Sequence, residues 1–196
     1  MAEIRSTMEM VLERAARLEA EAGDALAQEE KIQDGMRLAA RYLADEELDM
    51  DQALSNRESG ELALILQGAV QSFMRNIVLP REDEPSPLLE KALQGLLLLG
   101  QSPETLAGLG EIKTIIEQYL QHKKQLMEQL EMQFAQQMGM MEDNLSQQTG
   151  VKMDLKPSQH PKFAEEWQKV MVQLNEQYGQ ALEQQKTFIQ QSLLAG

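Results

Sequence analysis

The sequence predicts an all-α protein, an elongated helical bundle with a long heptad helix at its N-terminus and an antiparallel helical hairpin at its C-terminus. Two observations lead to this prediction. Apolar residues recur at heptad spacing over residues 4–43, and two apolar helical faces flank a loop at 149–161 that contains glycine and proline. The composition agrees, because aromatic residues are only 4% of the chain and the 6 prolines are clustered, which leaves long stretches without helix breakers.

The heptad stripe of residues 4–43 alternates spacings of four and three and is interrupted only by Glu29. A helix over these positions would be about 60 Å long and could not bury its own stripe. The pattern therefore predicts a partner helix, either from the same chain or from a second copy, and we expect a homo-oligomer with a dimer favoured. The residues predicted to form the oligomer seam are Ile4, Met8, Val11, Leu18, Ile32, Met36 and Leu43.

Glu29 places a carboxylate on this seam, where a buried charge would be costly without a partner. It either pairs with a base on the facing helix and sets the register, or it reaches water through a partly open site.

The pattern divides the chain into residues 1–57, the heptad helix, residues 58–110, a buried middle of short apolar helices, and residues 111–196, the hairpin. In the middle segment, residues 61–79 are apolar nearly all round and should form the most buried helix.

Serine–proline pairs mark two further helix starts, at Ser86 and at Ser102, because serine caps a helix and proline fits its first turn. Gly100 is a natural end for the helix that spans residues 88–99. Gly108 and Gly110 predict a short helical turn followed by a kink.

The two hairpin arms can be aligned by assuming that they pack antiparallel about a centre near residue 154. Partner numbers should then add up to about 308, and the polar interruptions of the two arms fall at the same level. The predicted pairs are Leu145 with Phe163, Met141 with Trp167, Phe134 with Leu174, Leu130 with Tyr178 and Tyr119 with Ile189. Lys123 and Gln185 are predicted to meet directly or through a shared water.

Charge and composition exclude several classes of function. The formal net charge of −14 argues against a nucleic-acid partner, which requires a positive surface. The apolar runs are too short or too interrupted for a membrane span, and the start of the chain has no signal-peptide pattern. The absence of cysteine excludes disulfides and thiolate chemistry. We expect a cytoplasmic protein.

Catalytic and metal-binding patterns are missing as well. A di-metal carboxylate bundle needs Glu-x-x-His pairs, but Tyr119 and Pro157 stand three residues before His122 and His160. The acidic run from Asp45 to Asp51 lacks the glycine and glutamate that a calcium loop requires. No phosphate-binding glycine loop or nucleophile elbow is present. We expect no catalytic residue, no cofactor and no metal site.

The remaining feature is methionine, at 13 residues. Flexible methionine surfaces suit protein partners, although most of these residues fit the hairpin core. The candidate partner surface is Met132 and Met140, together with the apolar helix 88–99. The sequence favours a non-enzymatic, self-associating scaffold or adaptor in a larger assembly. The alternatives are a chaperone-like holder of a client protein and, less favoured, a ligand or metal site inside the bundle.

Overall fold

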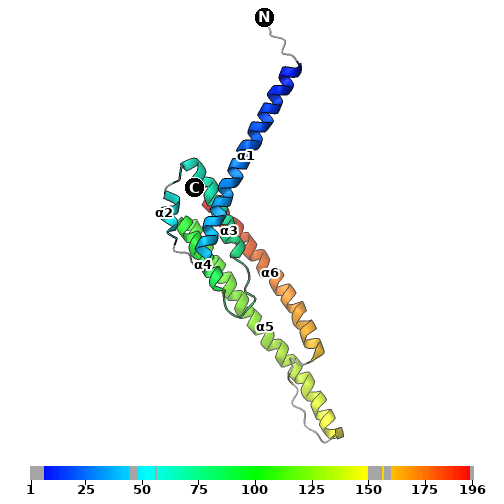
Figure 1. The fold of residues 1–196 in the computed structure, drawn as a ribbon. Coiled ribbons are helices and arrows are strands. Elements are labelled where there is room, and N and C mark those ends of the chain that lie inside the picture. Colours follow the sequence, from blue (N-terminus) through cyan, green and yellow to red (C-terminus); the bar gives the residue numbers. More distant parts are fainter. Residues whose placement is uncertain (1–6, 45–47, 56, 150–155, 157–159, 195–196) are drawn as a thin grey trace. The chain divides into compact units, whose positions relative to one another are not determined.

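The computed structural model describes residues 7–44, 48–55, 57–149, 156 and 160–194. These residues form six helices and contain no strand, which confirms the all-α prediction (Figure 1). The helices are α1 (Thr7–Leu43), α2 (Met50–Ser55), α3 (Ser59–Asn76), α4 (Pro87–Leu99), α5 (Pro103–Thr149) and α6 (Pro161–Leu194).

The chain forms two compact units. Unit 1 comprises Met1–Asn76, Lys91–Gln101 and Leu193–Gly196, and unit 2 comprises Ile77–Glu90 and Ser102–Ser192. The predicted middle segment, residues 58–110, therefore contributes to both units and is not a unit of its own.

Local capping explains where the central helices begin. The N–H of Leu89 donates to Ser86 Oγ at 3.2 Å, and the N–H of Thr105 donates to Ser102 Oγ at 3.1 Å. The short helix α2 is not anticipated by the apolar pattern. It has an aspartate cap of the same kind, since the N–H of Gln52 donates to Asp49 Oδ1 at 3.0 Å.

Unit 1 is built on the contact between α1 and α3, which run in the same direction. Lys31 forms an ion pair with Glu61 at 2.6 Å, and the ring of Tyr42 meets that of Phe73 edge-on with centroids 5.7 Å apart. The helices are closest where Gly35 faces Ile65 and Gly68 faces Ile32. The stripe is thus covered by α3 of the same chain over roughly the last third of α1, where Ala39 is fully buried.

The core of unit 1 continues from α3 into α4. Phe73 is fully buried, and its ring occupies the space that a side chain at Gly95 of α4 would need. The buried positions of α3 are Ile65, Gly68, Ala69, Val70, Phe73 and Met74, which agrees with its nearly all-round apolar sequence.

Unit 2 contains the predicted helical hairpin, made of α5 and α6, but the predicted register is wrong. Four contacts between the arms join Phe134 to Phe163, Tyr119 to Tyr178, Thr105 to Ser192 and Gly108 to Ile189. The partner numbers add up to 297 in each pair, 11 fewer than predicted.

The shift follows from the unequal ends of the arms. Helix α5 continues to Thr149, well beyond Phe134, whereas Phe163 lies in the first turn of α6. The middle of the connecting loop is therefore not the centre of the packed hairpin. The side chains of Leu145 and Met141, predicted to meet Phe163 and Trp167, lie outside the described part of the structure.

The kink expected at Gly108 and Gly110 is also wrong, because α5 runs without interruption from Pro103 to Thr149. A Cβ atom at Gly108 would lie 2.6 Å from Ile189 Cγ1, so this glycine allows α6 to approach α5 closely. Packing against α6 offsets the cost of glycine within a helix.

Candidate functional site

The first candidate is the N-terminal arm, which we define as residues 7–30 of α1. Each described side chain of the arm is exposed, and Figure 1 shows the arm extending beyond α3 in unit 1. The arm is rich in alanine, glutamate, arginine, leucine and methionine, which favour helix formation.

Large apolar side chains of the arm are exposed to solvent. The exposed fraction is 73% for Met8, 57% for Leu18 and 68% for Leu26. Glu29 is exposed and accepts a hydrogen bond of 3.5 Å from Gln33 Nε2, so its carboxylate reaches water. An exposed apolar stripe of this kind is typical of a surface that binds another helix.

The predicted seam is thus divided into two parts. Ile32, Met36 and Leu43 are half-buried within unit 1, whereas Met8 and Leu18 are exposed on the arm. Ile4 and the side chain of Val11 lie outside the described part of the structure.

The second candidate is an apolar groove in unit 2 with a volume of about 550 Å³. One side is the loop that follows α3 in the sequence, residues 77–86, which we call the strap; the other side is α6. The residues that line the groove are Ile77, Val78, Leu79, Pro80, Arg81, Tyr119, Met171, Asn175, Gly179, Leu182 and Glu183.

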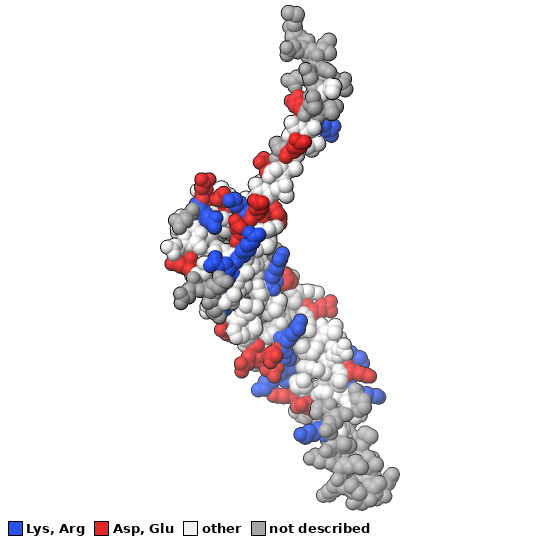
Figure 2. Space-filling model, in the orientation of Figure 1, with Lys and Arg blue, Asp and Glu red and all other residues white. Residues whose placement is uncertain are grey.

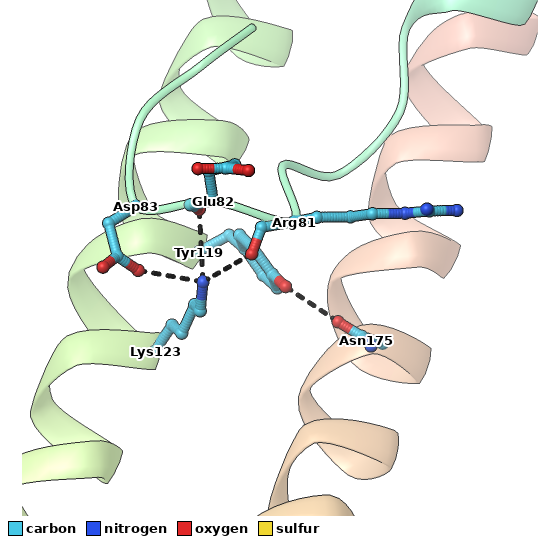
Figure 3. Close-up of polar contacts among 6 residues, drawn as sticks. All are labelled: Arg81, Glu82, Asp83, Tyr119, Lys123 and Asn175. Atoms are coloured by element: carbon cyan, nitrogen blue, oxygen red, sulfur yellow. Dashed lines mark hydrogen bonds and ion pairs between the residues drawn. The ribbon is translucent and has the colours of Figure 1, made fainter.

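A single lysine anchors the strap to α5 (Figure 3). Lys123 Nζ donates to Arg81 O at 2.9 Å, to Glu82 O at 3.1 Å and to Asp83 Oδ1 at 2.9 Å. The predicted contact between Lys123 and Gln185 is therefore wrong, because the amino group points to the strap.

Tyr119 and Gly179 are two of the residues that line the groove. The hydroxyl of Tyr119 donates to Asn175 Oδ1 at 2.9 Å, which links α5 to α6 beneath the strap. Burial raises the pKa of Tyr119 above its ordinary value of 10.0, so the phenol stays neutral at physiological pH. A Cβ atom at Gly179 would meet no atom within 4 Å, so the absence of a side chain leaves this part of the groove open.

The structure describes only part of the partner surface that the sequence predicts. Met132 is 61% exposed on α5, and the side chain of Met140 lies outside the described part. In the apolar helix 88–99, Leu88 and Leu98 are exposed while Leu96 is fully buried. The helix is mainly a core element with two exposed leucines.

Both histidines lie beside polar partners within the fold. His122 Nδ1 lies 3.4 Å from the hydroxyl of Tyr178, and His160 Nδ1 accepts a hydrogen bond of 3.2 Å from the N–H of Lys162. Among the described residues, no three metal-ligating side chains come together. The hydrogen bond to Glu61 raises the pKa of Lys31 above 10.5, as the bond to Glu166 does for Lys169.

Two further properties of the described residues concern charge on the surface and the length of apolar helices. On the face drawn in Figure 2, acidic and basic side chains alternate and form no continuous basic patch. None of the described helices combines the length and the apolar run that crossing a bilayer requires.

The chain matches the model of a family of unknown function (DUF6657) over residues 51–191, and it belongs to this family. The groove, the strap and all but the last three residues of the hairpin lie within the matched residues, whereas the N-terminal arm precedes them. No curated protein and no solved structure matches the chain.

Proposed function

We propose that this protein is a non-enzymatic scaffold or adaptor that self-associates through its N-terminal arm. The observation that carries the proposal is the exposed stripe that contains Met8 and Leu18, with Leu26 on its flank, which continues the heptad pattern of the part of α1 that α3 covers. The same spacing that forms a helix contact within unit 1 is thus available a second time, for a helix from another copy.

The energetics support a helix partner. Fully burying a leucine or methionine side chain contributes about 1.5–3 kcal/mol, and each copy would bury several such side chains. This gain has to exceed the loss of translational and rotational freedom on association. Acids of the arm such as Glu13 and Asp24 stand away from the stripe, so they stay in water when the stripe is covered.

The test is light scattering coupled to gel filtration on the full chain. The wild-type protein should elute as a dimer or a larger oligomer. Leu18→Gln should shift it towards the monomer, because a polar amide replaces the centre of the stripe. Met10→Gln is the matched control, since Met10 is exposed on the same helix but outside the stripe. A monomeric wild-type protein would refute the proposal.

A second candidate function is supported by the groove beside the strap. An open groove with a mainly apolar lining suits a holder of an apolar stretch of a client protein. Binding of a hydrophobic fluorescent dye to the native protein tests this candidate.

Gly179→Leu should reduce the dye signal, because the new side chain takes up space in the groove from a position where a Cβ atom meets nothing within 4 Å. Gly110→Leu is the control, because Gly110 is an exposed helical glycine of unit 2 that is also free of neighbours within 4 Å and lies outside the groove. Equal dye binding by both variants would argue against the groove as the binding site.

A further inference from the structure

We propose that two N-terminal arms pair in antiparallel orientation. In each facing pair of residues, one from each copy, the two residue numbers add up to 33. Met8 of one copy then lies opposite Ala25 of the other, and Ala15 opposite Leu18. This inference rests on the proposed self-association and specifies how the arms meet.

The sizes of the stripe residues favour this orientation. In the sequence, the stripe of the arm contains Met8, Val11, Ala15, Leu18, Ala22 and Ala25. In a parallel pair each residue meets its own copy, so Leu18 meets Leu18 while three layers contain only alanine. In the antiparallel pair large side chains face alanines, which keeps the two helices at one distance along the contact.

The length of exposed helix selects the same register. Helix α1 begins at Thr7, and α3 begins beside α1 near Lys31, which pairs with Glu61 in the first turn of α3. Partners that add up to 33 place residue 7 opposite residue 26. The contact then covers nearly the whole arm and ends before the level of α3. A parallel pair would bring both copies of α3 to the same end of the contact.

The charges beside the stripe are compatible with this arrangement. Arg14 and Glu21 occupy the same flank, and the antiparallel register places Arg14 of each copy near Glu21 of the other. A parallel pair would instead bring Arg14 near Glu19, so the charges by themselves do not distinguish the orientations. The distinction comes from the side-chain sizes and the exposed length.

The absence of cysteine from the chain permits a direct test by cross-linking. Met8→Cys and Ala25→Cys variants are prepared separately, mixed, allowed to exchange subunits and treated with a short thiol-specific cross-linker. Antiparallel pairing predicts a covalent dimer in the mixture and none in either variant alone. In this register identical positions are about 25 Å apart along the helix, because they are 17 residues apart in alignment. A mixture of Met8→Cys with Ala27→Cys is the control, because Ala27 lies away from the stripe.

The outcomes separate the orientation from self-association itself. Cross-linking of Met8→Cys with itself, and of Ala25→Cys with itself, would show a parallel pair and overturn the inference while self-association stands. A dimer by light scattering without cross-linking in any mixture would place the contact elsewhere and also overturn it. A monomer by light scattering would refute both proposals.

Discussion

Gly35 of α1 and Gly68 of α3 occupy equivalent places in one helix crossing. A Cβ atom at Gly35 would overlap the carbonyl oxygen of Ile65, and a Cβ atom at Gly68 would overlap that of Ile32. Each glycine thus lies three residues after the isoleucine that the other glycine faces. The reciprocal absence of side chains lets the two backbones approach each other, as small residues do at close helix contacts.

Alanine at either glycine of this crossing should destabilise unit 1. A methyl group there meets backbone atoms, which do not move aside as a side chain would, so overpacking should cost about 1–3 kcal/mol. Gly23→Ala is the control, because nothing lies within 4 Å of a Cβ atom at this exposed helical position. That variant should gain up to about 1 kcal/mol from helix propensity. Thermal unfolding followed by circular dichroism measures both, and equal stability of Gly35→Ala and Gly23→Ala would contradict the crossing.

Loss of the lysine that anchors the strap should free the strap locally. Lys123→Met removes three hydrogen bonds, and the free energy of unfolding should fall by about 1 kcal/mol, because water can replace the amino group at the exposed strap. Trypsin should cut faster after Arg81, which the measurement follows by mass spectrometry of the fragments. Lys124→Met is the control, because Lys124 is the exposed neighbour in the sequence. An unchanged cutting rate at Arg81 in Lys123→Met would rule out this anchoring role.

Two glycines of α5 should respond differently to alanine. At Gly108 a Cβ atom would lie 2.6 Å from Ile189 Cγ1, whereas at Gly110 it would meet nothing within 4 Å. We expect Gly108→Ala to lose about 1–3 kcal/mol through overpacking. Gly110→Ala should gain up to about 1 kcal/mol through helix propensity. Urea unfolding monitored by the single tryptophan compares them, and a stabilised Gly108→Ala would show that α6 does not pack against this glycine.

Alkaline pH should weaken the fold in part through Tyr119. Burial raises the pKa of Tyr119 in the folded protein above the ordinary value of 10.0 that applies after unfolding. Above about pH 10 the unfolded chain therefore releases a proton that the folded protein retains, so the free energy of unfolding falls as pH rises. The raised pKa of Lys31 acts in the same direction.

Tyr119→Phe should make this alkaline decline shallower. Asn175→Ala provides the comparison, because it removes the hydrogen bond of Tyr119 and keeps the phenol. Denaturant unfolding at a series of pH values from 8 to 11 is the measurement. A pH dependence identical to that of the wild-type protein in Tyr119→Phe would show that the phenol does not contribute.

The sequence alone determined the helical class and several helix ends, because these depend on neighbouring residues, although it indicated neither α2 nor the continuity of α5. The capping hydroxyls of Ser86 and Ser102 act on N–H groups three residues away, and the stop at Gly100 is equally local. The faces of the two hairpin arms were predictable for the same reason, since apolar spacing marks which side of a helix is buried.

The register of the hairpin was decided by tertiary packing. Eleven residues make about three helical turns, so sliding one arm by 11 residues presents nearly the same face to its partner. The apolar spacing is therefore compatible with both alignments. Contacts between the arms, such as those of Phe134 with Phe163 and of Tyr119 with Tyr178, distinguish them.

The tertiary structure also decided which part of the heptad stripe is available to a partner. The spacing is the same at Leu18 and at Met36, yet Leu18 is exposed and Met36 is half-buried beside Gly68 of α3. A periodic pattern predicts that one face of a helix is apolar. Whether that face is buried depends on where another helix begins to pack against it. The position of the strap was also decided by tertiary structure, because Lys123 anchors it through contacts with residues about 40 positions away in the sequence.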